Sequence, residues 1–431
     1  MILKIAWRNI YRNKKRSLIT ITSVFAALFL IILMRALQFG FYDKLIETVV
    51  ESYAGYVEIH ADGFWDNQSL DNSMQVDQAL ISDIKSVDGV ENIVQRLQTF
   101  SLISMGDKTK GGVINGVNLD EEQKITDWNK KMVSGSFDLD KNEIIIGKGI
   151  AEFFRVSEND TLILYGQGYR GMMAAGKYPV KGIIDLKNPD LNKLGVFMTM
   201  ETARDYVSSD EVSTHIIIDK EKYYKEEKIV EDLNNVLSED YEIMTWKQTL
   251  PEIEQTITAD SAGGLIMAFI LYVLVVFGMF GTVLMMTEER KYEFGVLISI
   301  GMSRLRLFGI ILCETIILSM IGVLLAIIVT YPICYYYNLN PIDMAILMGD
   351  GADQMMEEMG FSPIAPMSIA WDIPLSHGLI IFIFSLLISI YPAFKILKLN
   401  PFSIKLFCKF LILPKYFIFI FTESLSSSSI W

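Results

Sequence analysis

Four long apolar segments constrain this chain more than any other feature of its sequence. A helix that crosses a bilayer needs about 20 apolar residues. Segments of that kind occupy Leu18–Leu37, Gly263–Thr287, Leu307–Tyr331 and Pro374–Ala393. The chain is nevertheless 21% charged, so it also contains a substantial aqueous part. The predicted fold class is therefore an α-helical membrane domain with four transmembrane helices plus a large α+β extracytoplasmic domain inserted between helices 1 and 2.

Charge is distributed unevenly along the chain. The formal net charge is −13, but residues 40–262 hold 22 Lys and Arg against 40 Asp and Glu, which gives −18 for this segment. The remaining residues therefore sum to +5, because −13 minus −18 is +5. An acidic aqueous domain attached to a basic membrane part argues against nucleic-acid binding.

Basic residues in the short flanks predict the orientation. They precede the first apolar segment, occupy the loop between the second and third, and follow the fourth. Because Lys and Arg concentrate in cytoplasmic loops, we expect these three flanks and the N-terminus in the cytoplasm, with the first segment kept as an anchor. The predicted domains are a cytoplasmic basic helix (1–17), helix 1 (18–39), the extracytoplasmic core with stalk helices (40–262), helix 2 (263–287), a short cytoplasmic helix (288–306), helix 3 (307–334), an external loop (335–373), helix 4 (374–394) and a cytoplasmic or interfacial tail (395–431).

The aqueous segment begins with a helical apolar stripe. Apolar residues recur at every fourth position after the first membrane segment, which predicts that the helix continues outward as a stalk. The stripe consists of Leu37, Phe41, Leu45, Val49 and Tyr53. A similar seam precedes the second segment, so two stalk helices packed together are expected, and two ordinary surface helices are the alternative. Short strands and amphipathic helices between them predict an α+β domain with two subdomains.

No active site is apparent in the sequence. None of the three cysteines lies in residues 40–262, so a disulfide framework there is excluded. The histidines His60, His215 and His377 are far apart in sequence and are predicted to be unclustered, which gives a zinc site no support. The stretch "GMMAAGKY" (171–178) nearly matches a phosphate-binding loop, but Tyr178 stands where a small hydroxyl should bind magnesium. We therefore expect no catalytic residues, no metal and no ATPase motif.

The loop between the second and third segments contains a short amphipathic helix, "ERKYEFGVLISIGMSRLRL" (289–307). Phe294, Leu297, Ile298 and Gly301 fall on one apolar face, and Gly301 can end the helix in a left-handed conformation. An apolar face at this place needs a partner, either the lipid surface or a protein groove. Glu314 lies about 10 Å into the third segment. It is expected to face protein, either as a structural partner of a Ser, Thr or Arg or as part of a conformational switch.

These motifs resemble a known family. The stretch "ERKYEFGVLISIGMSRLRLFGIILCE" (289–314) resembles the signature of FtsX-like ABC-transporter permeases, "YPAFKILKLNP" (391–401) resembles their closing motif, and "AWRNIYRNKKRSLIT" (6–20) resembles their opening. The stretch "EIIIGKGIAEFFRVSENDTLIL" (143–164) resembles the external core domain of MacB-type and lipoprotein-releasing permeases. The resemblance covers about residues 1–401. The aromatic sequence after Pro401 and the long Met-rich loop at 335–373 depart from it.

The resemblance implies a bacterial inner-membrane permease subunit that binds no cofactor itself and works with a separate ABC ATPase, which uses ATP. The contact with the ATPase would fall on Glu293, Phe294, Gly295, Leu297 and Gly301. The resemblance further implies a second permease copy or paralogue as dimer partner, contact with membrane lipid, and a periplasmic lipoprotein carrier or an outer-membrane component as an additional partner.

The function implied is mechanotransmission, in which ATP-driven motion in the cytoplasm moves the external domain, with lipoprotein release as the leading cargo hypothesis. Efflux of an antibiotic or peptide from the periplasm is one alternative. A non-transporting regulator of a cell-wall hydrolase is the other.

Overall fold

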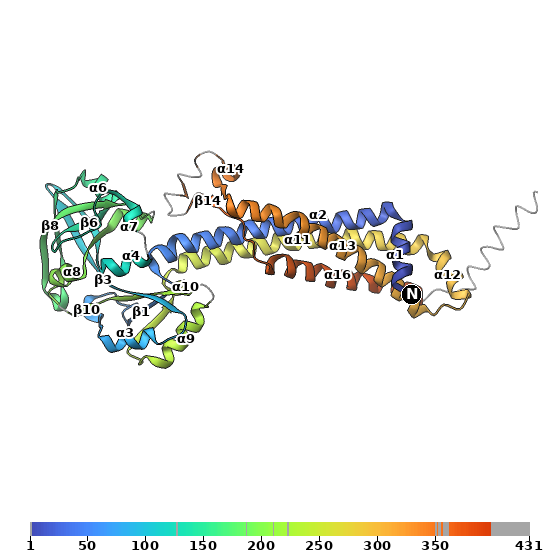
Figure 1. Cartoon of the computed structure of the whole chain (residues 1–431), viewed down its shortest axis with the longest axis horizontal. Coiled ribbons are helices and arrows are strands. Elements are labelled where there is room, and N and C mark those ends of the chain that lie inside the picture. The colour runs from blue at the N-terminus through green and yellow to red at the C-terminus, as the bar shows by residue number, and fades with distance from the viewer. Residues whose placement is uncertain are drawn as a thin grey trace, which may run out of the picture. The chain divides into compact units, whose positions relative to one another are not determined.

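The computed structural model describes residues 2–397 apart from 126–127, 187, 210, 222–223, 350, 352–354 and 357–361. The expected tail beyond residue 397 therefore lies outside the described residues. Contacts divide the chain into two compact units. The first, here called the membrane unit, comprises 1–39, 261–340 and 367–431, and the second, the αβ unit, comprises 40–260 and 341–366. Figure 1 shows the elements of both.

The membrane unit contains the four predicted apolar helices, which the structure confirms. They are α2 (Lys14–Ile46), α11 (Pro251–Glu289), α13 (Arg304–Leu339) and α16 (Asp372–Leu397). All four are long and apolar enough to cross a membrane. Two short helices accompany them: α1 (Ile2–Arg12), which packs against α13, and α12 (Lys291–Ser299) in the loop between α11 and α13.

Small and hydroxyl residues bring these helices together. A Cβ atom on Gly322 of α13 would lie 2.8 Å from the Val24 side chain of α2, so only glycine allows this close approach. The Thr20 hydroxyl of α2 donates a hydrogen bond to the Thr282 hydroxyl of α11 at 3.0 Å. The first and second apolar helices are thus paired through a polar contact within an otherwise apolar surface.

The αβ unit is built on one ten-stranded sheet, so the two predicted subdomains do not have separate sheets. The strand order is β12-β1-β11-β3-β4-β9-β6-β8-β5, and β7 pairs with both β3 and β8. The strands are β1 (Val57–Ala61), β3 (Val90–Met105), β4 (Lys108–Val117), β5 (Met132–Gly135), β6 (Ile144–Gly147), β7 (Thr161–Gln167), β8 (Met173–Ile184), β9 (Gly195–Thr199), β11 (His215–Lys220) and β12 (Tyr241–Thr245). The 16-residue strand β3 pairs with β11 through its N-terminal half and with β4 and β7 through its C-terminal half, and thereby joins the two parts of the sheet.

Separate apolar cores cover different parts of this sheet. One face of β1 and β11 packs Val57, Ile59, Ile216 and Ile218 against α3 (Gln78–Lys85) and α9 (Glu226–Val236). A larger core joins β6, β7 and β8 with α6 (Lys148–Phe154) and α8 (Met200–Val207). The alternation of buried and exposed residues along β7 and β8 is typical of a sheet with one face in the core.

The Gly-Lys sequence at 176–177 lies within strand β8. A phosphate-binding loop would instead join a strand to a helix. The structure thus agrees with the interpretation that this stretch is not a nucleotide site.

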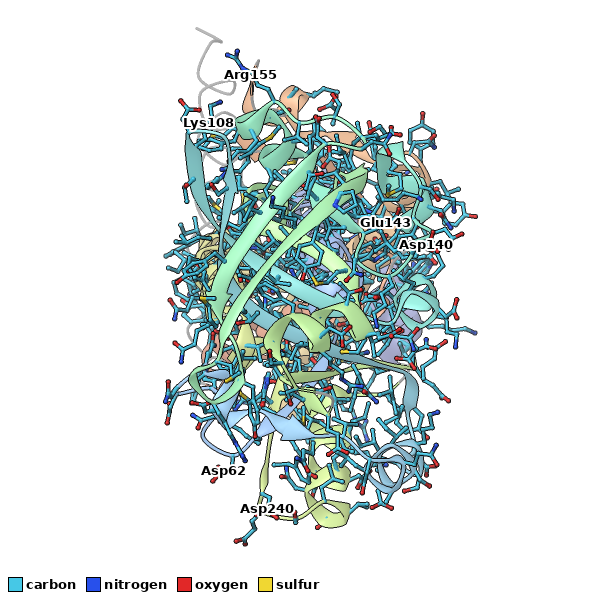
Figure 2. The ribbon with its side chains drawn as sticks, turned by 90° about the vertical axis from the view of Figure 1, so that its left-hand side faces the viewer. Asp62, Lys108, Asp140, Glu143, Arg155 and Asp240 are labelled. Carbon is cyan, nitrogen blue, oxygen red and sulfur yellow. The ribbon has the colours of Figure 1, made fainter. Side chains whose placement is uncertain are left out.

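Most charged side chains of the αβ unit lie at its surface. Figure 2 shows Asp62, Lys108 and Asp240 at the periphery of the unit, and all three are exposed. Three charged residues behave differently, because Glu58, Arg96 and Glu122 are each no more than 7% exposed. A buried charge is costly unless it is paired, so these residues need a physical explanation.

Candidate functional site

The short helix α12 is fixed in place by its two ends. Arg290 precedes it, and Gly301 follows it with a φ of +102°, the left-handed conformation predicted from sequence. The Gly301 N–H donates to the Ile298 carbonyl and the Met302 N–H donates to the Leu297 carbonyl, each at 3.0 Å. These bonds satisfy carbonyls that a helix end would otherwise leave unpaired.

One face of α12 is used inside the membrane unit. Phe294 is 1% exposed and packs against Leu307 and Ile311 of α13, and Leu297 packs at the edge of the same cluster. Gly295 is also buried. Within the chain itself, Phe294 is therefore covered by α13, and the predicted contact of Glu293, Phe294, Gly295, Leu297 and Gly301 with an ATPase stays a prediction.

The opposite face of α12 is exposed and apolar. The exposed fractions are 55% for Tyr292, 39% for Val296 and 78% for Ile300. Glu293 and Gly301 are exposed as well. A partner that meets this helix would therefore contact Tyr292, Val296 and Ile300 before it could reach Phe294. Sequence periodicity alone could not separate the two faces, since both carry apolar residues.

Ion pairs connect α12 to helices from distant parts of the sequence. The Arg12 guanidinium of α1 donates to both carboxylate oxygens of Glu293, at 2.7 and 2.8 Å. Arg290 donates to Glu314 of α13 at 2.9 Å, and both residues are buried. Further pairs at this end of the helices join Arg16 to Glu289 and Lys395 to Glu288.

These charges determine the state of the carboxylate on α12. Partial burial alone would raise the pKa of Glu293, but the hydrogen bond and charge of Arg12, together with those of Arg290, outweigh it and hold the pKa below its ordinary value. Glu293 is therefore ionised at neutral pH. Glu314 faces Arg290, which fits the expectation that this intramembrane acid has a protein partner.

The stalk residues do not form one evenly buried stripe. Leu45 is 2% exposed, whereas Leu37, Phe41 and Val49 are half-buried. The expected four-residue repeat ends at Ile46, because residues Glu47–Ala54 form a π-helix, whose hydrogen bonds span one residue more than those of an α-helix. Tyr53 follows this change and leaves the stripe.

Tyr53 instead belongs to a buried polar group beside the sheet. Its hydroxyl donates to Asn115 at 2.8 Å, and burial raises its pKa to about 12. The Arg96 guanidinium lies 3.8 Å from the Tyr53 ring centroid and donates to both oxygens of Glu122, at 2.5 and 3.0 Å. This bidentate pair explains how Arg96 and Glu122 can both be buried.

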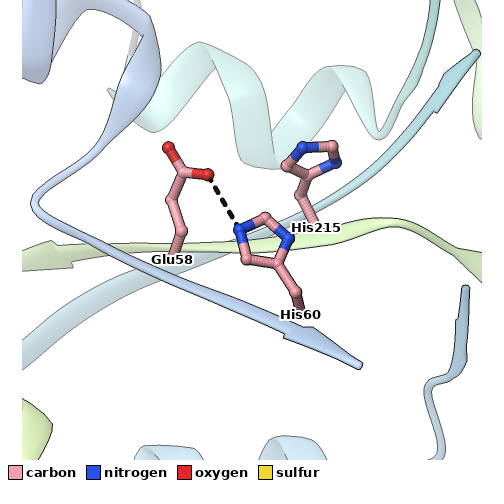
Figure 3. Close-up of side chains that lie close together, drawn as sticks. All are labelled: Glu58, His60 and His215. Atoms are coloured by element: carbon pink, nitrogen blue, oxygen red, sulfur yellow. Dashed lines mark ion pairs between the residues drawn. The ribbon is translucent and has the colours of Figure 1, made fainter. Parts of the chain in front are cut away.

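The prediction that the histidines are unclustered is wrong for two of them. His60 on β1 and His215 on β11 have ring centroids 4.7 Å apart, and Glu58 lies beside them (Figure 3). Burial, then the neighbouring His60 and Arg96, hold the pKa of His215 well below its ordinary value. Their distance in sequence did not reveal this contact, because β1 and β11 are antiparallel neighbours although about 150 residues separate them. The alternation "VEIHA", with Glu58 and His60 two residues apart, was the one available signal.

Comparison with known proteins places part of this chain in a family. The FtsX-like permease C-terminal family model matches residues 265–401, which begin within α11. The chain is also 22% identical over 410 residues to the ABC transporter permease YtrF of Bacillus subtilis (strain 168). That alignment covers 84% of this chain and 90% of the relative.

Two solved structures are similar to parts of the chain. The extracellular domain of the noncanonic ABC-type transporter YknZ from Gram-positive bacteria matches 44% of this chain and 100% of its own, with 16% identity and a TM-score of 0.31. The periplasmic region of MacB from Actinobacillus actinomycetemcomitans matches 47% of this chain and 94% of its own, with 13% identity and a TM-score of 0.33. The resemblance to FtsX-like permeases that the sequence motifs predicted is confirmed: residues 265–401 match the C-terminal domain of that family, and most of the chain is similar to an ABC transporter permease.

Proposed function

We propose that this chain is the permease subunit of an ABC transporter and transmits the motion of a separate ATPase subunit to the αβ unit. The observation that carries the proposal is the state of α12. Its inner face is packed on α13, its charges are tied to α1 and α13, and Tyr292, Val296 and Ile300 remain exposed on its outer face. A helix held rigidly by its own chain, with an apolar outer face, is suited to receive a push from a partner.

The motion would pass along α2 and α11. Each runs without interruption from the membrane unit into residues of the αβ unit, as Lys14–Ile46 and Pro251–Glu289. Within the αβ unit, the Tyr42 hydroxyl donates to the Asp260 carboxylate at 2.6 Å and joins the two helices. Continuous helices transmit displacement, whereas a flexible linker would absorb it. In this arrangement the N-terminus and α12 face the cytoplasm, the αβ unit lies outside, and two permease copies or paralogues act with two ATPases.

A hydrophobic cargo, of which a lipoprotein is the leading candidate, agrees with an apolar patch on the αβ unit. Neighbouring strands β3 and β7 expose Phe100, Leu102, Ile163 and Tyr165 on the solvent face, and Leu102 lies directly opposite Tyr165 in the strand register. Contiguous exposed apolar side chains usually mark a binding surface. Polar side chains, among them Gln68 and Gln167, line the same pocket as Phe100, Leu102 and Tyr165, so a peptide or drug cargo is the alternative to a lipid-linked one.

The coupling contact can be tested by Val296→Asp. We expect the purified membrane complex to lose its ATPase subunit and its ATP hydrolysis, because a carboxylate would be buried without a partner in the interface. Val236→Asp is the matched control, since Val236 is 47% exposed on α9 and lies outside the proposed contact. Normal recovery of the ATPase with the Val296→Asp chain would contradict the proposal.

The cargo surface has a separate test. A photoreactive amino acid at Tyr165 should crosslink to a diacylated peptide added to the reconstituted complex, and the same group at Val236 should not. Equal crosslinking at both positions would exclude the strand patch as the cargo site while leaving the coupling assignment intact.

A further inference from the structure

Three potential metal ligands converge on the face of the sheet opposite the α3–α9 core. Glu58 and His60 are two residues apart on β1 and therefore point to the same side, whereas Val57 and Ile59 point into the core. The register pairs Ile59 with Ile216, so the next pair along the two strands is His60 with His215. Figure 3 shows the three side chains pointing toward one another. This arrangement does not depend on the permease function.

The hydrogen bond of His60 determines which of its nitrogens is available. Nδ1 lies 3.1 Å from the Thr214 carbonyl oxygen, which can only accept, so Nδ1 carries the hydrogen. Nε2 of the neutral ring then presents a lone pair. This atom is fully buried and makes no hydrogen bond within the described part of the chain, yet it lies 3.2 Å from Oε2 of Glu58. A lone pair facing a carboxylate oxygen requires a positive charge between them.

The Nδ1 atom of His215 also makes a hydrogen bond, in this case with a hydroxyl. This Nδ1 lies 2.6 Å from the Thr214 hydroxyl oxygen, and that hydroxyl donates its own hydrogen to the Arg96 carbonyl. While that hydroxyl donates to the Arg96 carbonyl, its oxygen accepts from Nδ1 of His215, and in this tautomer Nε2 of His215 carries the lone pair that a metal would bind. A single residue, Thr214, thus fixes both rings, one through its carbonyl and one through its hydroxyl. Histidine ligands in metal sites are typically fixed in this way through the nitrogen that does not bind the metal.

The Glu58 carboxylate has no hydrogen-bonded counter-charge among the described residues, although the Arg96 guanidinium is near enough to interact with it electrostatically. It is 7% exposed, and among the described residues no group donates a hydrogen bond to it. The nearest guanidinium, on Arg96, is engaged with Glu122 through two hydrogen bonds. An isolated buried carboxylate is expensive, and a divalent cation is one of the few groups that can offset its cost.

We propose that Glu58, His60 and His215 bind a divalent transition-metal ion, of which zinc is the best match. Two imidazole nitrogens and one carboxylate oxygen form a ligand set that zinc uses, with the fourth position open for water or another ligand. Ligand atoms on a tetrahedral zinc are about 3.3 Å apart. The His60–Glu58 separation of 3.2 Å fits this value, and one ligand atom from each of the three residues lies within 4.8 Å of the others. Small rotamer changes of the half-buried His215 would complete the set.

The test uses the full chain in detergent, purified without a histidine tag, stripped with a chelator and dialysed against buffered zinc. We expect about one zinc per chain by elemental analysis and a higher unfolding temperature with zinc than without it. His215→Gln and Glu58→Gln should lower zinc affinity by more than the roughly 10–100-fold that loss of an outer partner costs. Both should also abolish the zinc-dependent rise in unfolding temperature.

The third histidine provides a matched control. His377 lies on α16 in the membrane unit, so His377→Gln should keep the zinc content and the thermal shift of the unmodified chain. The proposal is overturned if the unmodified chain binds no zinc, or if His215→Gln and His377→Gln bind it equally. In either case a proton on His60 would be the charge that faces Glu58. Because the unfolding temperature without zinc is measured for each variant, a folding defect is distinguished from a binding defect.

Discussion

The two units of this protein treat buried acids differently. In the membrane unit, Glu314 lies in an apolar helix and faces the Arg290 guanidinium at 2.9 Å. In the αβ unit, the Arg96 guanidinium donates to both carboxylate oxygens of Glu122, whereas the ion-pair partner of Glu58 among the described residues is the His60 imidazole. A guanidinium is charged at any physiological pH, whereas an imidazole is charged only if it binds a proton or a metal. The comparison distinguishes buried ion pairs, which hold elements together, from the cluster of Glu58, His60 and His215, in which either a proton or a metal ion would supply the positive charge.

The location of these groups leads to the same distinction. Arg290 and Glu314 connect the residue before α12 to α13, and Arg12 connects α1 to α12, so the charges of the membrane unit join separate helices. Glu58, His60 and His215 lie instead on two adjacent strands that backbone hydrogen bonds already join. The strands therefore do not need this cluster to stay together, which favours a role in binding.

The largest expected effect comes from one chemical change made at two buried acids. Glu122→Gln should destabilise the αβ unit by about 3–5 kcal/mol, because it leaves the Arg96 guanidinium buried without its counter-charge. Glu58→Gln, measured with the metal removed, should cause no loss of stability, because it removes a charge that lacks a full partner. Hydrogen exchange of strand β3 in the full chain measures both. If the two variants were equally destabilised, the distinction between the two acids would be wrong.

A smaller effect is expected at Thr214, which fixes both histidine rings. Thr214→Ala removes the hydroxyl that is hydrogen-bonded to His215 and should weaken zinc binding by roughly 10–100-fold, while Thr214→Ser should retain most of the affinity. Competition with a chromophoric zinc chelator provides the measurement. Equal affinities for the Ala and Ser variants would show that the hydroxyl does not orient His215.

The smallest effect is expected at the exposed end of the membrane unit. Arg12→Ala breaks the pair with Glu293, but these side chains are 55% and 45% exposed, so the loss of stability should be at most about 1 kcal/mol. Salt should reduce this difference further, because exposed charges are screened. Thermal unfolding of the two chains at low and high ionic strength tests the expectation. A loss of stability as large as that expected for Glu122→Gln would contradict the prediction that the Arg12–Glu293 pair contributes little.

The local elements were largely predictable because short-range patterns specify them. Apolar length identified the four membrane helices, and short strands mixed with amphipathic helices identified the α+β class of the aqueous part. The end of α12 at Gly301 also followed from local chemistry, because only glycine adopts its backbone conformation without strain.

The sequence by itself determined the membrane-spanning segments, the excess of acid in the aqueous part and the resemblance to a permease family. Only the tertiary structure decided which face of α12 is covered, where the stalk repeat ends, and that His60 meets His215. The physical reason is that hydrophobic periodicity reports which residues avoid water but not what covers them. Pairing between strands far apart in sequence depends on the whole sheet, so no local pattern could bring two distant histidines onto one site.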